Sequence, residues 1–169
     1  MLRKAFNRLL HLIAFVVPFG NSFRPFLHRL TGCKIGKNVW ISKFVYIDDN
    51  HPESIEIGDN TTIGLRTSIF AHTYFGPPKK ENPDRVIIGK NVFIGPHCLI
   101  LPNVIIGDNS VIKGGTVVTR NVPPNTFYGL PNAEPLAHVT VPLTSEHSYE
   151  EFLKGLRPIR KNKNIKDKE

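Results

Sequence analysis

Sulfur is scarce in this chain of 169 residues, which contains two cysteines and one methionine. Cys33 and Cys98 lie too far apart to form a zinc-ligand motif. They are also too few for the disulfide framework of a small secreted domain, although they could form a single disulfide. The scarcity of cysteine favours reduced thiols, and we expect a cytoplasmic protein.

The chain also lacks an apolar run long enough to span a bilayer. Its most apolar stretch, LRKAFNRLLHLIAFVV, contains basic residues and stops before Pro18. The order of charges is that of a signal peptide, but no small-residue cleavage site follows, so export is not expected. Two interpretations remain open and are compatible. The stretch could be a helix that covers the end of a repeat structure, or residues 1–17 could contact anionic lipid through Arg3, Lys4 and Arg8.

Acidic residues are absent from the first part of the chain and rare in the last. Residues 1–34 carry six Lys or Arg and no acid, and residues 154–169 carry seven against two acids. The segment between them, 35–153, has nine bases and twelve acids. The formal charge of +8 therefore belongs to the two ends. No basic groove is indicated in the body, and we expect no nucleic-acid partner.

A period of six residues dominates the middle of the chain. Position one is Ile in eleven of twelve hexads and Val in the other, and position five is usually small or β-branched. A helix would need a period near 3.6 and a two-faced strand a period of 2, whereas short strands joined by tight turns fit a period of six. The hexads are IGKNVW, ISKFVY, IDDNHP; IGDNTT, IGLRTS, IFAHTY; IGKNVF, IGPHCL, ILPNVI; IGDNSV, IKGGTV, VTRNVP. Three hexads make one coil, so the sequence predicts an all-β parallel β-helix of about four coils.

Position four of the hexads predicts the corners of the coils. Seven of its twelve residues are Asn and one is Gly, the residues that adopt positive φ at least cost. His72 and His97 also occupy this column, so each could be a tolerated corner residue. The repeat, however, is interrupted from Phe75 to Val86, directly after His72. Long loops in compact domains are often functional, and we therefore single out His72 as a candidate catalytic residue.

Four extra residues separate the first and second coils, which places Asn50 in register with His72. A histidine base is usually oriented through its second ring nitrogen. Asp48 and Asn50 are the nearest candidates for that role, although the run Asp48-Asp49-Asn50 could also be a solvated turn.

The hexads and the run VIIGKNVFIGPHCLILPNVIIGDNSVIKGGTVVTRNVPPNTFYGLP resemble the hexapeptide-repeat acyltransferases, a group with galactoside, maltose and serine O-acetyltransferases and acetyltransferases of polysaccharide gene clusters. The run VPFGNSFRPFLHRLTGCKIGKNVWIS is similar to the helical entry of the polysaccharide-cluster members. The resemblance covers about Gly32 to Pro142. It implies a left-handed β-helix, a homotrimer and acetyl-CoA bound between two subunits. It also implies a catalytic histidine just before a protruding loop, which is the place of His72.

These observations divide the chain into an N-terminal helical cap (1–34), a catalytic β-helix (35–131) with a loop at 75–87, and a C-terminal extension (132–169) with a short helix and a basic tail. By resemblance, five residues are expected to contact coenzyme A: Gly95, Lys113, Gly114, Thr119 and Arg120. Family members often carry a basic residue after the Gly-x-Pro element. Here Gly129-Leu130-Pro131 is followed by Asn132-Ala133-Glu134, so one expected phosphate contact is missing.

The expected activity is transfer of acetyl to a hydroxyl of a sugar or surface-polysaccharide precursor. N-acetylation of an amino sugar and a non-catalytic trimeric scaffold are the alternatives. A zinc enzyme with three histidine ligands is disfavoured, because His72 and His97 are predicted on different edges and no closely spaced histidine pair completes a site. We therefore expect no metal.

Overall fold

The computed structural model describes residues 2–72 and 84–159. These residues form two compact units, with the boundary between Leu130 and Pro131. The predicted loop at 75–87 and the basic tail lie mainly outside the described residues. The finer division into segments 1–34, 35–131 and 132–169 stays a prediction.

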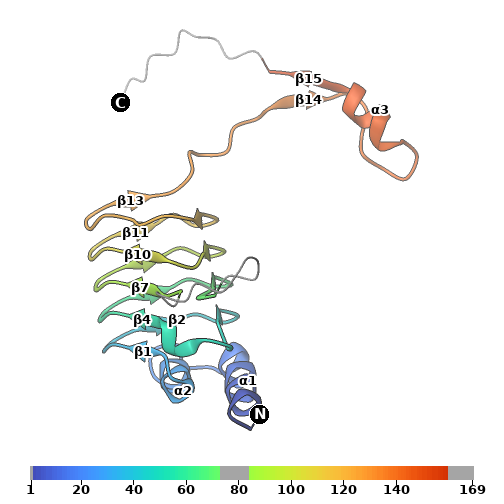
Figure 1. Ribbon diagram of the computed structural model, residues 1–169. Helices are drawn as coiled ribbons and strands as arrows, with labels where there is room; N and C mark the ends of the chain where they lie inside the picture. Colours follow the sequence, from blue (N-terminus) through green and yellow to red (C-terminus); the bar gives the residue numbers. More distant parts are fainter. Residues whose placement is uncertain (1, 73–83, 160–169) are drawn as a thin grey trace. The chain divides into compact units, whose positions relative to one another are not determined.

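The first unit is a stack of coils built from three parallel sheets (Figure 1). Each coil contributes one short strand to each sheet, because a turn follows every hexad. Sheet A contains β1 (Lys34–Ile35), β4 (Ile55–Ile57), β7 (Val86–Ile88) and β10 (Val104–Ile106). Sheet B contains β2 (Trp40–Ile41), β5 (Thr62–Ile63), β8 (Phe93–Ile94), β11 (Val111–Ile112) and β13 (Phe127–Tyr128). Sheet C contains β3 (Tyr46–Ile47), β6 (Ser68–Ile69), β9 (Leu99–Ile100) and β12 (Val117–Val118).

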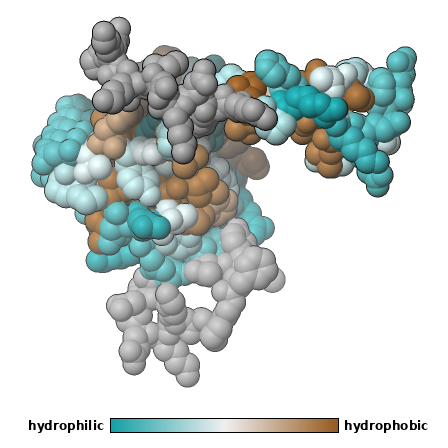
Figure 2. Space-filling model, turned by 90° about the horizontal axis from the view of Figure 1, so that it is seen from above, coloured by the Kyte–Doolittle hydropathy of each residue, from teal (hydrophilic) through white to brown (hydrophobic). Residues whose placement is uncertain are grey.

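The position-one residues form the core of this unit. Ile41 pairs with Ile63, Ile63 with Ile94, and Ile94 with Ile112, and all four side chains are fully buried. Sheets A and C contain equivalent columns. Fully burying an aliphatic side chain of this size contributes about 1.5–3 kcal/mol. The predicted role of position one is therefore confirmed, and the predicted register across the four-residue insertion is confirmed by the pair Ile47 and Ile69. Seen from above, hydrophobic residues gather over the middle of the coils (Figure 2).

The corner between sheets A and B carries a ladder of asparagine amides. Each Nδ2 donates to the Oδ1 of the asparagine in the next coil, over distances of 2.9–3.2 Å. All five backbones have positive φ, between 53° and 58°. The fifth member was not predicted, because it lies beyond the twelve hexads. The ladder comprises Asn38, Asn60, Asn91, Asn109 and Asn125.

Three residues lie at predicted corners but lack the expected positive φ. Asn50, His72 and Asn121 are described residues, and none is among those with positive φ. All three lie between sheets C and A, where the chain departs from the repeating turn. Insertions follow Asn50 and His72, whereas the chain after Asn121 reaches its place opposite Ile106 early, at Val122. Asn103, at the same corner without either change, has a positive φ of 62°. His97, at the corner between sheets B and C, does have a positive φ of 57°. Tolerance of a left-handed corner therefore accounts for His97 and not for His72.

Two helices precede the first coil, α1 (Leu2–Val16) and α2 (Phe23–Thr31). They pack against each other and against the strands and 3₁₀ helix of the first coil, η1 (Pro52–Ser54). Arg24 joins the layers, since its Nε donates to the carbonyl of Val17 at 2.7 Å and its Nη1 to that of Ile41 at 2.6 Å. The predicted cap over the open end of the coils is thus present.

The layer between the helices and the coil contains two buried histidines. Burial, reinforced by His11 and Arg24, lowers the pKa of His28 to about 3. Burial also lowers the pKa of His11, against a smaller opposing effect of Asp49 and Asp48. The rings of His11 and His28 are 5.8 Å apart, and His11 lies 5.0 Å from the ring of Tyr46. A proton added to His28 would therefore be buried beside His11 and Arg24, with no carboxylate among the groups that act on its pKa.

We expect acid to loosen this cap well before it unfolds the coils. The folded-state pKa of His28 lies below its unfolded value of about 6.5, so the unfolded segment takes up the proton first. Stability is complete above that value and falls as the pH drops, by up to about 1.4 kcal/mol per pH unit. Amide hydrogen exchange in α2 should be faster at pH 5.5 than at pH 7.5, after correction for intrinsic rates. The variant H28L should weaken this dependence, and an unchanged dependence would contradict the assignment.

The second unit contains β14 (Ala137–Val139) and β15 (Leu156–Pro158), an antiparallel pair, with α3 (Tyr149–Lys154) between them in the chain. Ser148 and Glu151 form a reciprocal capping box at the start of α3. The short helix was predicted and the strand pair was not.

Within residues 2–72 and 84–159, no helix is both long enough and apolar enough to cross a membrane.

Candidate active site

The corner that joins sheet C to sheet A carries the candidate site. Asp48 follows β3 in the first coil, and Ala71 and His72 follow β6 in the second. Because β3 and β6 pair in parallel, with Ile47 opposite Ile69, the ends of these strands lie one above the other. Residues that follow the two strands are therefore brought together by the stacking of the coils.

Asp48 has no solvent exposure, and both of its carboxylate oxygens are engaged. Oδ1 accepts the backbone N–H groups of Asn50 at 3.0 Å and His51 at 3.4 Å. Oδ2 accepts the N–H of Ala71 at 2.9 Å and contacts Nδ1 of His72. A buried carboxylate is costly unless hydrogen bonds replace its hydration, and these groups provide them. The Asp48 side chain is thus held rigidly below the imidazole.

The contact between Nδ1 of His72 and Asp48 fixes the orientation of the imidazole ring. An ionised carboxylate only accepts hydrogen bonds, so Nδ1 carries the proton and Nε2 is the nitrogen with the lone pair. The His72 side chain is 19% exposed, compared with 0% for Asp48. This arrangement suits a ring that receives a proton at Nε2 while Asp48 stabilises the charge that develops.

The side chain of Asn50 lies beside a different carboxylate from the one that contacts His72. The backbone N–H of Asn50 binds Asp48, and its side-chain Nδ2 lies 3.5 Å from Oδ1 of Asp49. Of the two candidate orienting residues, the structure brings only the Asp48 side chain to His72.

Sequence reasoning missed His51, whose ring centroid lies 5.3 Å from that of His72. Nδ1 of His51 is 3.6 Å from Oε1 of Glu53. A signal for His51 does exist, because it replaces the small or β-branched residue that is usual at position five of a hexad, at the same corner as His72. A cleft of about 340 Å³ adjoins it, lined by Lys34, His51, Glu53, Ser54, Glu56, Arg85 and Ile87.

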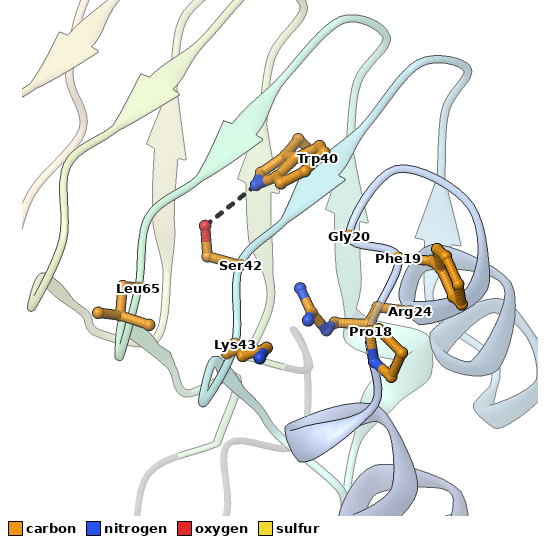
Figure 3. A pocket seen from close by; sticks show the side chains of 8 residues that line it. All are labelled: Pro18, Phe19, Gly20, Arg24, Trp40, Ser42, Lys43 and Leu65. Atoms are coloured by element: carbon orange, nitrogen blue, oxygen red, sulfur yellow. Dashed lines mark hydrogen bonds between the residues drawn. The ribbon is translucent and has the colours of Figure 1, made fainter.

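A second cavity of about 350 Å³ lies elsewhere, between the α1–α2 connection and sheet B (Figure 3). Its walls are mostly apolar and include Pro18, Phe19, Trp40 and Leu65. The Nε1 of Trp40 donates to the hydroxyl of Ser42 at 3.2 Å. No residue of the candidate corner lines it. The charged cleft beside His51 is therefore the better candidate for a substrate site.

The five residues expected to contact coenzyme A lie at two different corners. Thr119 and Arg120 follow β12 and are exposed at the corner of His72, two coils further on. Gly95, Lys113 and Gly114 lie at the corner between sheets B and C. Gly95 also has a packing role, because a Cβ there would lie 2.5 Å from the backbone nitrogen of Gly114. Nζ of Lys113 donates to the carbonyl of Leu130 at 3.0 Å. The five residues therefore do not form a single site within one chain.

His97 lies at the corner of the glycines and is exposed, whereas His72 lies at the next corner. Over the described parts of the chain, no cluster of three His, Cys, Asp or Glu side chains has the arrangement of a metal site. Cys33 and Cys98 are both buried and unpaired.

The comparisons with known proteins agree with this architecture. Residues 85–120 match the family model "Bacterial transferase hexapeptide (six repeats)". In sequence, the chain is 39% identical over 107 residues to "Putative acetyltransferase YvoF" of Bacillus subtilis, covering 63% of this chain and 59% of that protein. It is 38% identical over 96 residues to galactoside O-acetyltransferase of Escherichia coli, covering 54% of this chain and 46% of the enzyme. The aligned segment thus spans about half the length of these relatives.

Solved structures share the fold. A hexapeptide-repeat acetyltransferase of Vibrio cholerae, complexed with acetyl coenzyme A, has a TM-score of 0.56 at 22% identity, over 73% of this chain and 79% of that one. Soybean serine acetyltransferase complexed with serine has a TM-score of 0.50 at 25% identity, over 77% of this chain and 54% of the enzyme. The predicted left-handed β-helix and the resemblance are confirmed, and the chain contains hexapeptide repeats similar to those of bacterial acetyltransferases.

Proposed function

We propose that this protein is an acetyl-CoA-dependent O-acetyltransferase that acts on a hydroxyl of a sugar or surface-polysaccharide precursor, with His72 as general base. One observation carries the proposal: a buried, hydrogen-bonded Asp48 carboxylate holds Nδ1 of the partly exposed His72. The His72 ring centroid lies 5.3 Å from that of His51, which lines a charged cleft. The Bacillus and Escherichia relatives support acetyl transfer, and galactoside O-acetyltransferase supports a sugar hydroxyl as acceptor. The Vibrio relative, solved in complex with acetyl coenzyme A, supports acetyl-CoA as the donor.

In the proposed reaction, Nε2 of His72 takes the proton of the acceptor hydroxyl while its oxygen attacks the thioester carbonyl. The carbon–sulfur bond of the tetrahedral intermediate then breaks, and the departing thiolate receives the proton from His72. Acetyl ester and coenzyme A are released, and the ring returns to its neutral form. General-base assistance of this kind is typically worth ~10²–10⁴ in rate. Asp48 is a positioning residue, because it acts through the histidine.

A homotrimer is part of the proposal. The five expected coenzyme contacts lie at two corners of one subunit. A cleft between two subunits would bring one corner of each subunit together, so that both groups of residues could contact one coenzyme. The outer face of sheet B offers a surface for self-association, since Phe93, Val111 and Phe127 are exposed and successive along it. Trp40 is exposed in the same column, beyond Thr62. Contiguous exposed apolar side chains of this kind mark interaction surfaces.

We propose a cytoplasmic reaction, because both thiols are unpaired, as expected in a reducing compartment. The acceptor is proposed to bind beside His51, where Glu53, Arg85 and Lys34 supply hydrogen-bond donors and acceptors for hydroxyl groups.

An acceptor screen tests this function. Purified protein should release thiol from acetyl-CoA when a matching sugar is present, at least tenfold faster than without an acceptor. The panel should pair each neutral sugar with its amino-sugar counterpart, so that O-acetylation and N-acetylation are separated by mass spectrometry of the product. Release that never depends on an acceptor, across neutral, amino and nucleotide-linked sugars, would favour the scaffold alternative.

A further inference from the structure

Helix α1 has two apolar faces, and the face directed to solvent is the more apolar one. The buried face consists of Asn7, Leu10, His11 and Ala14, of which two are polar. The opposite face is exposed, with solvent-exposed fractions of 89% for Leu2, 51% for Phe6, 56% for Leu9, 64% for Leu12, 39% for Ile13 and 59% for Val16. An ordinary surface helix places its apolar stripe against the core and its polar residues in water. The exposed stripe of α1 therefore needs a partner other than the core of its own unit.

Helix α2 and the connection before it extend this apolar surface. Phe23, Phe26 and Leu30 are 40–50% exposed at the spacing of one helix face, and Phe19 in the connection is 66% exposed. The rings of Phe23 and Phe26 stack with centroids 6.3 Å apart. The two helices lie side by side below the first coil (Figure 1), so their stripes belong to one end of the unit. We call the exposed apolar residues of α1, Phe19 and α2 the basal surface.

Positive charge surrounds the basal surface. Arg3 and Lys4 are exposed in the first turn of α1, and the side chain of Arg8 is 63% exposed while lying 3.7 Å from Asp49. On the helical wheel Arg8 borders the apolar stripe of α1, and Lys4 lies further from the stripe on the same side. Arg3 falls between Leu10 and Ala14 on the wheel, although it is itself exposed at the start of the helix. No acidic residue occurs in residues 1–34. Long basic side chains at the edges of an apolar stripe can reach anionic headgroups while the stripe enters the acyl region.

We infer that the basal surface docks onto an anionic lipid bilayer, with α1 lying in the plane of the interface. The helix has 15 residues and a length of about 22 Å, which suits interfacial binding and is too short to span a bilayer. A second copy of this chain is the less suitable partner, because two basal surfaces would bring like charges together. The apolar column of sheet B already supplies a separate surface for self-association. Docking does not depend on the proposed acetyl transfer; only its consequence, access to lipid-linked acceptors, rests on that function.

Vesicle flotation with the full chain tests this inference. We expect the protein to float with vesicles of 70% phosphatidylcholine and 30% phosphatidylserine, and to bind pure phosphatidylcholine at least tenfold more weakly. The double variant F6E/L9E should lose binding by tenfold or more. The matched control L136E/L143E, which adds the same charges at exposed leucines of the second unit, should bind like the original protein. R3Q/K4Q should bind anionic vesicles roughly 25-fold more weakly, since each cation near such a surface contributes about 1 kcal/mol.

Three results would overturn the inference. The first is a failure of the unmodified protein to float with anionic vesicles, and the second is equal binding by F6E/L9E. The third is a change in the molar mass of F6E/L9E in solution, measured by light scattering, which would assign the surface to contacts between copies. Because Phe6 and Leu9 are exposed, circular dichroism of the variant should match the original. Thiol release by F6E/L9E with a soluble acceptor should also be unchanged, so loss of docking and loss of catalysis are separable.

Discussion

The variant H72A should fold and bind acetyl-CoA but lose acceptor-dependent thiol release by ~10²–10⁴-fold, the usual contribution of a general base. The side chain is partly exposed and lies at a corner, so its removal takes no aliphatic group from the core. What disappears is the ring nitrogen that we propose receives the proton of the acceptor. The rate should be measured as thiol release with the acceptor identified by the screen, alongside a thermal unfolding curve.

Two further variants make this result specific. H97A removes the histidine at the neighbouring corner, which has a positive φ and is exposed, and it should keep nearly the full rate. H72N keeps a nitrogen that can donate to Asp48 but offers no base, so it should be as slow as H72A while retaining more stability. A rate for H72A equal to that of the original protein would show that His72 is not the base. Equal losses in H72A and H97A would point to a general effect on the fold.

The second large effect is expected for D48N. The amide can present an oxygen to the backbone N–H groups or a nitrogen to the ring, but it has only one acceptor atom for both sides of the site. At present Oδ1 accepts two backbone N–H groups, and Oδ2 accepts the N–H of Ala71 and contacts His72. One buried donor therefore loses its partner, which costs about 1–3 kcal/mol of stability. The ring also loses the charge that favours its protonated form, so we expect kcat to fall by at least ~10²-fold.

Separating positioning from stability requires a matched control. D49N changes the adjacent carboxylate, which accepts from Tyr46 at 3.1 Å and lies 3.7 Å from Arg8 rather than at the imidazole. It should change kcat by less than threefold. A structural role alone would lower the amount of folded D48N without altering the pH profile of the folded fraction. A catalytic positioning role predicts a shifted pH profile, with kcat affected more than the KM for acetyl-CoA. Equal kcat values for D48N and D49N would contradict that role.

The repeating part of the fold was predictable because one rule applies in every coil. Position one must be aliphatic to fill the interior, and the strand pairs connect the position-one residues across the inserted residues, as between Ile47 and Ile69. The left-handed sense of the β-helix was predicted from the family resemblance and not from the six-residue period. The second unit lies outside the repeat. The pair of β14 and β15 joins segments with no shared period, so nothing in the pattern indicated that they would meet.

The candidate site was partly predictable for the same reason. Stacking brings the residues that follow β3 to those that follow β6, so Asp48 could be placed below His72. The sequence could not decide whether Asp48 or Asn50 contacts His72, because the path of the turn determines which side chain points inward. His51 was missed because it occupies position five of its hexad, a position expected to hold a small or β-branched residue rather than a functional side chain. The expected coenzyme contacts were assigned by resemblance. Resemblance alone does not show that they lie at two different corners, which follows from the geometry of the coils.

The most direct test of His72 as the base is a structure of the assembled protein with coenzyme A bound. We predict that the sulfur of the coenzyme lies in a cleft between two subunits, within about 4 Å of the space in front of Nε2 of His72, with Nδ1 still held by Asp48. An imidazole that faces open solvent, distant from both the coenzyme and every neighbouring subunit, would contradict this role.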